Sequence, residues 1–319
     1  MFYCTAPGLA MWTLDWGMRI YELSGKLDSS LEALGKGWYC LTLPLPRRRL
    51  DGCACHSPLA HFHIHHTESS IREIHPFTTI THLATQKLSV PSSTSEKPLT
   101  STGSDQTISI QFLFRKSDSL TPKNQPLELQ KPISKQWTNK LASLVEDAHP
   151  TDPEPQSPRL TPIQTSLRLE GPYFTPADPA TYSTVICLVA GTGISGAIAI
   201  AAAFSAQSHP PPSTPGPKWK KCLIVWSVRE TDHIELPFWK RDTPGLEVRP
   251  WLTGGGRERL DLRQAIEDGG KDGAEAGVQG GGVRGKDTWV YISGPNAFIQ
   301  QGEAACREAG VGFFGARWS

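Results

Sequence analysis

Hydrophobic and polar positions change their rhythm about halfway along the chain. In the first half, Ile108, Ile110, Phe112 and Phe114 alternate with polar neighbours, the period-two pattern of a strand with one buried face. Several short strands between turn-rich stretches are typical of an antiparallel barrel or sandwich. The other segments with this pattern are 38–43, 61–65, 77–82 and 166–169.

Beyond Gly171 the apolar residues run together instead of alternating. Residues 184–190 (TVICLVA) form an unbroken apolar run, which indicates a parallel strand covered on both faces. The run leads into GTGISG at 191–196 and then into the apolar segment 197–204, which predicts a buried helix. An α/β unit is therefore predicted. Its further strands and helix are expected at 222–228, 288–293 and 296–309.

The first 24 residues are apolar and aromatic, but Pro7, Asp15 and Arg19 interrupt them. Trp12 and Trp16 suit a membrane interface, where indole rings are enriched. Two interpretations stay open: a helix packed on the core of the protein, or the end of a transmembrane helix whose beginning is missing.

Polar stretches divide the chain into an N-terminal segment and two domains. We expect a membrane-proximal remnant of a transmembrane helix at 1–24, a barrel domain at 25–174 and an α/β domain at 175–319. Stretches rich in Ser, Thr, Pro or Gly predict disordered insertions. These insertions are expected at 89–106, 147–162, 207–217 and 268–286.

Composition and charge exclude several classes of protein. The chain has 319 residues, with 32 Lys and Arg against 31 Asp and Glu, so its formal charge is only +1. That balance argues against a nucleic-acid binder that uses its whole surface. No apolar run reaches the length of about 18 residues that a multi-span membrane protein would need. The seven scattered cysteines indicate a reducing compartment rather than a disulfide scaffold.

Two segments of the second half suit a dinucleotide. The glycines of GTGISG lie between a predicted strand and a predicted helix, where backbone N–H groups approach a pyrophosphate closely. The alternative is an ordinary strand–helix turn. The next strand ends with Ser227 and Arg229, where an NAD-specific site often has an acidic residue. Arg229 therefore favours the 2′-phosphate of NADPH, unless it is only a solvated arginine.

Several motifs in order resemble one family. The chain contains WTLDWGMRIYEL, HPFT, QWTNKL, LEGPY, VAGTGIS, IVWSVRE and YISGPNAF. Together they resemble the cytosolic dehydrogenase half of ferric-chelate reductases and NADPH oxidases, with fungal ferric reductases the most similar. The resemblance covers about residues 9–84 and 108–316. It implies the ferredoxin–NADP reductase fold: an α+β two-domain chain with an antiparallel β-barrel FAD domain followed by an α/β parallel-sheet NADPH domain.

By this resemblance, one group of residues binds FAD. Phe77 packs near the isoalloxazine, and Thr78 hydrogen-bonds near its reactive nitrogen. Trp137 and Thr138 match the second flavin site, which meets the FAD pyrophosphate, and Trp318 lies where relatives put an aromatic ring over the flavin. The residues that line the flavin are His75, Pro76, Phe77 and Thr78.

The same resemblance assigns the NADPH side. Gly171 and Pro172 shape the nicotinamide side of the cleft, and Gly294 and Pro295 close over the nicotinamide. Ser227 and Arg229 meet the adenosine phosphate. The pyrophosphate is held by Gly191, Thr192, Gly193, Ile194 and Ser195.

The chain departs from the family in three ways. Ser293 stands where relatives have a cysteine before the Gly-Pro pair, so hydride transfer is expected to be slow. Phe174 stands where a glycine often follows Gly-Pro-Tyr. The helices that carry haem are not in this sequence. The catalytic group expected from the resemblance is Thr78, Ser293 and Trp318.

Cysteines and histidines near the start of the barrel offer a rival interpretation. Cys53, Cys55 and His56 precede a run with alternating histidines at 61, 63 and 65. Thiolates and imidazoles bind zinc or copper, but zinc pairs are usually two to four residues apart. A strand with one polar face explains the histidines, and no metal is assigned.

The sequence thus predicts a flavin-dependent oxidoreductase that passes electrons from NADPH through FAD to a haem or ferric-iron acceptor. Two alternatives are a soluble NADPH diaphorase and a truncated, non-catalytic remnant that binds nucleotide. The expected partner is a haem-bearing transmembrane acceptor, absent from this chain, with possible membrane-surface contact through residues 1–24 and no nucleic acid. The expected location is the cytosolic face of a membrane, or the cytoplasm if the short N-terminus is natural.

Overall fold

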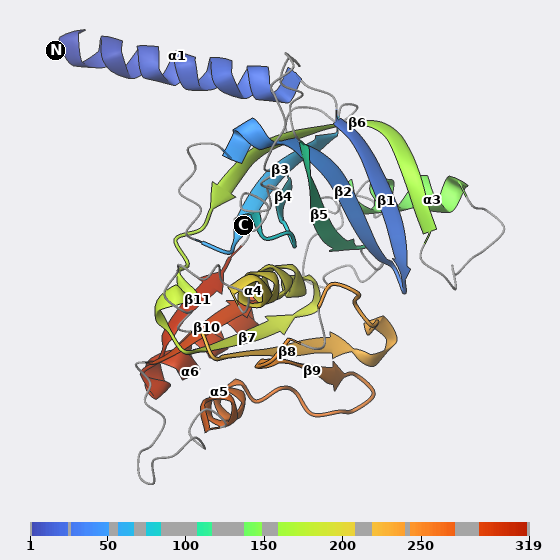
Figure 1. Ribbon diagram of the computed structural model, residues 1–319, viewed down its shortest axis with the longest axis vertical. Helices are drawn as coiled ribbons and strands as arrows, with labels where there is room; N and C mark the ends of the chain where they lie inside the picture. Colours follow the sequence, from blue (N-terminus) through green and yellow to red (C-terminus); the bar gives the residue numbers. More distant parts are fainter. Residues whose placement is uncertain are drawn as a thin grey trace, which may run out of the picture.

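The chain folds around two sheets of opposite character (Figure 1). One sheet has six strands whose pairings are all antiparallel, and the other has five strands whose pairings are all parallel. This confirms the predicted two-domain fold class. The computed structural model describes residues 2–24, 27–50, 57–66, 75–83, 107–116, 137–148, 159–207, 219–239, 243–271 and 287–317.

The antiparallel sheet has the strand order β4-β3-β6-β1-β2-β5. A bridge between Thr79 and Phe112 joins the chain just after β4 to β5, so the two ends of this order meet and the sheet closes into the predicted barrel. The Thr79 hydroxyl strengthens this closure by donating to the carbonyl of Gln111 at 3.0 Å. The strands are Leu27–Gly35 (β1), Trp38–Pro46 (β2), Ala60–His66 (β3), His75–Thr78 (β4), Thr107–Arg115 (β5) and Arg159–Phe174 (β6).

Alternating side chains fill the barrel. Phe62 and Ile64 are fully buried in its core, whereas the histidines that alternate with them on β3, at 61, 63 and 65, point to the opposite face. The predicted strand at 61–65 is therefore confirmed. Helix α3 (Trp137–Ala148) buries Leu141 and Val145 in the same apolar cluster.

The parallel sheet has the strand order β11-β10-β7-β8-β9, with α4 on one face and α5 and α6 on the other (Figure 1). Its central strands are buried on both faces, as their unbroken apolar runs predict. The strands are Thr184–Ala190 (β7), Lys221–Arg229 (β8), Leu246–Thr253 (β9), Thr288–Ser293 (β10) and Gly312–Ala316 (β11). The helices are Ile194–Gln207 (α4), Leu262–Lys271 (α5) and Asn296–Ala309 (α6).

Short 3-10 turns lie at several strand ends. Two of them, Gly191–Gly193 (η5) and Glu230–Asp232 (η6), directly follow β7 and β8. The other two are Arg47–Leu50 (η1) and Pro179–Thr181 (η4).

The two domains share one cluster of buried apolar residues. Trp38, Leu59 and Leu113 of the barrel are buried in one cluster with α4 and the facing side of the parallel sheet. The ring of Trp38 meets the ring of Trp226 edge to face, with centroids 5.8 Å apart. Because this cluster is continuous, the barrel and the α/β domain pack against each other through buried apolar side chains.

Helix α1 (Phe2–Ser24) projects away from the barrel (Figure 1). Its described side chains from residue 7 to residue 18 are all exposed. The first interpretation of this segment, a helix packed on the core, is therefore wrong for these residues. None of the helices in the described parts of the chain combines the length and apolar character needed to cross a bilayer.

Parts of three predicted insertions belong to helices or strands in the structure. Residues 159–162 belong to β6, where Pro162 pairs with Ser30 of β1, so backbone pairing overrides the local proline content. Residues 147–148 end α3, residue 207 ends α4 and residues 268–271 end α5, so disorder is also wrong there. The remaining insertion residues lie outside the described part of the chain.

His82 makes the barrel's stability depend on pH. Burial lowers the pKa of His82 from 6.5 to about 4. Between these values the unfolded chain binds a proton that the folded chain does not, so acidification favours unfolding. We expect the melting temperature to fall as the pH drops from 6.5 to 4, and His82→Gln to flatten this dependence. Melting curves at matched pH would test this, and identical pH dependence in the two proteins would contradict it.

Candidate functional site

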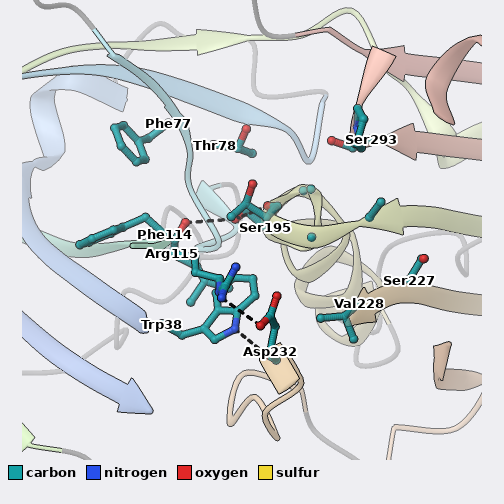
Figure 2. Close-up of a pocket in the computed structure, with 18 of the residues that line it drawn as sticks. Trp38, Phe77, Thr78, Phe114, Arg115, Ser195, Ser227, Val228, Asp232 and Ser293 are labelled. Carbon is teal, nitrogen blue, oxygen red and sulfur yellow. Dashed lines mark hydrogen bonds and ion pairs between the residues drawn. The ribbon is translucent and has the colours of Figure 1, made fainter. Parts of the chain in front are cut away.

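A cavity of about 730 Å³ lies between the barrel and the α/β domain (Figure 2). The α/β side of its wall includes Ala190, Arg229, Thr253 and Ser293, which stand at the carboxyl ends of four parallel strands. That edge of an open parallel sheet is where ligands bind in this class of fold. The barrel side is supplied by β2, β4, β5 and α3.

Most of the residues singled out in the sequence meet around this cavity. They come from segments more than two hundred residues apart, so their convergence is a property of the fold. Those that line it are Pro76, Phe77, Thr78, Thr138, Gly191, Thr192, Gly193, Ser195, Ser227, Arg229, Ser293, Gly294 and Pro295.

Trp137 and Ile194 are predicted site residues whose side chains belong to the core. Trp137 begins α3 and is 3% exposed, with its ring 5.1 Å from the ring of Phe77. Ile194 begins α4 and is fully buried. Neither side chain lines the cavity, so any contribution to binding comes from the backbone at the start of each helix.

Gly171 and Pro172 are predicted site residues that do not line this cavity. They form an irregularity in β6 opposite β3, away from the cavity lining. Gly171 has a φ of +114°, and a Cβ there would meet the carbonyl oxygen of His61 at 3.2 Å. These two residues therefore shape the β3–β6 pairing, and their predicted place on the nicotinamide side stays a prediction.

Five further residues from the sequence analysis have no described side chain or position. His75 begins β4, but its side chain is not among those described. Trp318 lies outside the described residues, as do Cys53, Cys55 and His56 of the rival metal interpretation. Among the described residues, no group of three His, Cys, Asp or Glu side chains is arranged to hold a metal ion.

Strand β4 presents Thr78 and Phe77 differently. In the pairing with β3, Phe77 stands opposite the buried Phe62, and Thr78 stands opposite His61 on the other face. Phe77 makes edge contacts with Phe112 and Phe114 at 6.4 Å. Its ring thus anchors β4 to the core while still reaching the cavity wall, and the Thr78 hydroxyl is the polar group that β4 offers.

The glycine-rich turn is held in place by its surroundings. The indole of Trp226 donates to the carbonyl of Gly191 at 3.1 Å, and the Ser195 hydroxyl donates to the carbonyl of Leu113 in the barrel at 3.3 Å. A Cβ on Gly193 would lie 2.7 Å from the carbonyl oxygen of Ser293. Glycine is therefore required at 193 for the turn to approach β10.

Ser293 is buried beside this turn, with 1% of its surface exposed. Its hydroxyl hydrogen-bonds to Tyr291, a cavity residue that the sequence analysis did not identify. Burial raises the pKa of the Tyr291 phenol well above its usual range, so the phenol stays neutral. The Ser293 side chain is consequently fixed from two sides, by Gly193 and by Tyr291.

Other cavity residues also went unnoticed in the sequence. They stand alone on strands or turns and belong to no local motif. The only signal in the sequence that could have found these cavity residues is an aromatic or charged residue next to the end of a predicted strand. The residues are Trp38, Leu113, Phe114, Arg115, Asp232 and Thr253.

No family model matches the chain, and no curated protein matches it. A mutant of ferredoxin-NADP+ reductase from Plasmodium falciparum in complex with 2′P-AMP aligns with 92% of this chain and 97% of its own, at 9% identity and a TM-score of 0.51. A second structure of that reductase with 2′P-AMP aligns over the same shares at 9% identity, with a TM-score of 0.50. The CS-b5R domains of human Ncb5or, in the NAD+ form, align with 91% of this chain and 68% of their own, at 16% identity and a TM-score of 0.48.

At these identities the comparisons establish the fold alone. The expectation of a fungal ferric reductase stays a prediction, and the coarser expectation is confirmed: the chain has the two-domain fold of ferredoxin-NADP+ reductases.

Proposed function

We propose that the chain is a flavin-dependent oxidoreductase that passes electrons from NADPH through FAD to a haem or ferric-iron acceptor. The observation that carries the NADPH–FAD part is the shared cavity. It brings Thr78 of the barrel together with the Gly191–Gly193 turn and Ser293 of the α/β domain. A flavin on the first and a nicotinamide on the second would therefore meet in one space.

The residues present fit two dinucleotides. The Gly191–Gly193 turn and the start of α4 offer backbone N–H groups to the NADPH pyrophosphate, while Arg229 offers charge to a 2′-phosphate. Thr138, in the first turn of α3, offers a hydroxyl to the FAD pyrophosphate. When bound, FAD accepts a hydride and releases electrons singly, which is the chemistry the protein lacks on its own.

The chain's own residues orient and shield these groups. Thr78 supplies a hydrogen bond to the flavin ring, and Ser293 limits where the nicotinamide ring can sit. Leu113 and Phe114 supply apolar wall on the barrel side, which keeps water from the space between the rings. The 2′P-AMP in the Plasmodium falciparum structures supports a site for a 2′-phosphate in this fold.

The acceptor rests on the sequence resemblance. Haem or ferric iron is supported by HPFT and the motifs that follow it in order. The two alternatives are a diaphorase that reduces quinones, dyes or free iron chelates, and a remnant that binds nucleotide without turnover. Reduction of any acceptor by the purified chain with NADPH would exclude the remnant. Reduction of a ferric chelate in preference to a quinone would favour the proposed ferric-iron acceptor over the diaphorase.

FAD binding tests the core of the proposal. The purified chain should take up FAD, show the flavin absorbance band and lose that band when NADPH is added without oxygen. Thr78→Ala should weaken FAD binding, because the only polar side-chain group of β4 described at the cavity is removed. Ser143→Ala, whose hydroxyl bonds to its own helix at Lys140, is the control. A folded preparation that takes up no FAD would defeat the proposal.

Arg229 should set the preference for NADPH over NADH. A hydrogen bond to a charged group contributes roughly 1.5–3 kcal/mol, so Arg229→Ala should lower the ratio of kcat/KM for the two nucleotides by about tenfold to a hundredfold. Arg257→Ala is the matched control, because Arg257 pairs with Glu230 and does not line the cavity. An unchanged ratio in Arg229→Ala would mean that another group recognises the 2′-phosphate.

Ser293 should limit the rate of flavin reduction. A thiol makes softer contact with an aromatic ring than a hydroxyl does, and small errors of placement slow hydride transfer strongly. We expect Ser293→Cys to speed flavin reduction by NADPH in stopped-flow measurements, while the dissociation constant of NADPH stays nearly the same. A slower or unchanged rate would show that Ser293 does not position the nicotinamide.

We also propose that α1 lies on a lipid surface. Large apolar side chains are exposed along its described part, from Leu9 to Met18. They include Trp12 (57%) and Trp16 (50%), whose rings are 6.1 Å apart. The helix projects away from the barrel, so these side chains are accessible to a membrane (Figure 1). Apolar insertion with interfacial indoles is the binding mode of helices that lie in the headgroup region.

Vesicles of neutral phosphatidylcholine test this surface. The full chain should sediment with them, with little effect of salt because the contact is apolar. The double variant Trp12→Ala/Trp16→Ala should lose most of this binding, whereas Trp251→Ala, which removes an exposed indole on β9, should keep it. Equal binding by the parent and the double variant would contradict a role for α1.

A further inference from the structure

The turn η6 carries two acidic residues that form different ion pairs. Glu230 pairs with Arg257 of its own domain at 2.8 Å, and both side chains are about half exposed. Asp232 pairs across the domain boundary with Arg115 of β5 at 3.0 Å, and these side chains are only 13% and 20% exposed. Glu230 and Asp232 are two residues apart on one turn, but of their two ion pairs only Asp232–Arg115 joins the domains.

A second bond reinforces the pair that crosses the boundary. The indole of Trp38, on β2, donates to the backbone carbonyl of Asp232 at 2.8 Å (Figure 2). Asp232 is therefore held by its side chain and by its main chain, from two neighbouring strands of the barrel. All three residues line the cavity.

We propose that Asp232, Arg115 and Trp38 form an interdomain clasp that sets the spacing between the two halves of the cavity. These three residues are positioning residues for the proposed hydride transfer. The contact itself does not depend on the proposed function, but its effect on catalysis rests on that function. Arg229, the proposed 2′-phosphate residue, lies three positions before Asp232. The clasp therefore fixes the nucleotide edge of the α/β domain against the flavin side of the barrel.

The clasp extends to the glycine-rich turn. Trp38 packs edge to face on Trp226, whose indole in turn donates to the carbonyl of Gly191. A shift of the clasp would therefore move both nucleotide-binding segments relative to Thr78. The Asp232–Arg115 pair is suited to this work because its partial burial reduces screening by water and salt, unlike the exposed Glu230–Arg257 pair.

The first test follows the geometry of the full chain without using its activity. Chain labelled with 5-fluorotryptophan gives a fluorine signal for Trp38, assigned by its loss in Trp38→Phe. Asp232→Asn should shift or broaden this signal, because the turn loses its charge pair with the barrel. Glu230→Gln, the matched control on the same turn, should leave it unchanged. An unchanged Trp38 signal in Asp232→Asn would overturn the clasp.

The second test measures flavin reduction in stopped flow. A displacement of about 1 Å in a reacting pair costs on the order of a hundredfold in rate, so Asp232→Asn and Arg115→Gln should each slow reduction by about tenfold to a hundredfold. If they act as one clasp, the double variant should be no slower than the slower single variant, within about twofold. Glu230→Gln should reduce flavin at the parent rate.

Asp232 could also act through its negative charge on the nucleotide, and the same measurements distinguish this effect from the clasp. Additive effects in the double variant, or tighter NADP+ binding without slower reduction in Asp232→Asn, would mean that Asp232 acts only through that charge, and would overturn the proposal. A chain that takes up no FAD but shows the expected fluorine shifts would instead refute the proposed function and leave the interdomain contact established.

Discussion

The edge contact of Trp38 with Trp226 ties two differently built sheets together, and the cavity depends on it. A closed antiparallel sheet and an open parallel sheet have no backbone pairing in common, so side chains must align them. The apolar cluster around Trp38, Leu113 and α4 supplies that alignment. At the edge of this cluster, the Ser195 hydroxyl donates to the Leu113 carbonyl of the barrel, and the Asp232 carboxylate pairs with Arg115 of the barrel.

The sequence pattern predicts several of the strands that are buried in a regular way, but not β1, whose buried side chains also alternate. Alternation marks β5, and unbroken apolar runs mark β7, β8 and β10. Strands β9 and β11 are not predicted because they are edge strands. β9 contains Glu247, Arg249 and Pro250, and β11 contains two glycines. An edge strand has one neighbour instead of two, so its composition reflects solvent more than the core.

The candidate site is predictable where its residues lie together in the sequence. HPFT and GTGISG are contiguous, whereas Arg115, Asp232 and Tyr291 come from separate strands and turns and meet only in the folded chain. A motif also does not tell which of its side chains faces a ligand. In a strand successive side chains alternate, so Phe77 joins the core contacts and Thr78 faces the other way.

Ser293 is fixed by its surroundings in β10 and α4. A buried hydroxyl without a partner is costly, so a serine buried at this position needs a hydrogen bond. Tyr291, two residues earlier on the same face of β10, supplies it. The phenol in turn packs under Gly196, where any side chain would collide with its oxygen. The serine, the tyrosine and the glycine of α4 therefore constrain one another, and the proposed nicotinamide subsite would depend on all three rather than on Ser293 alone.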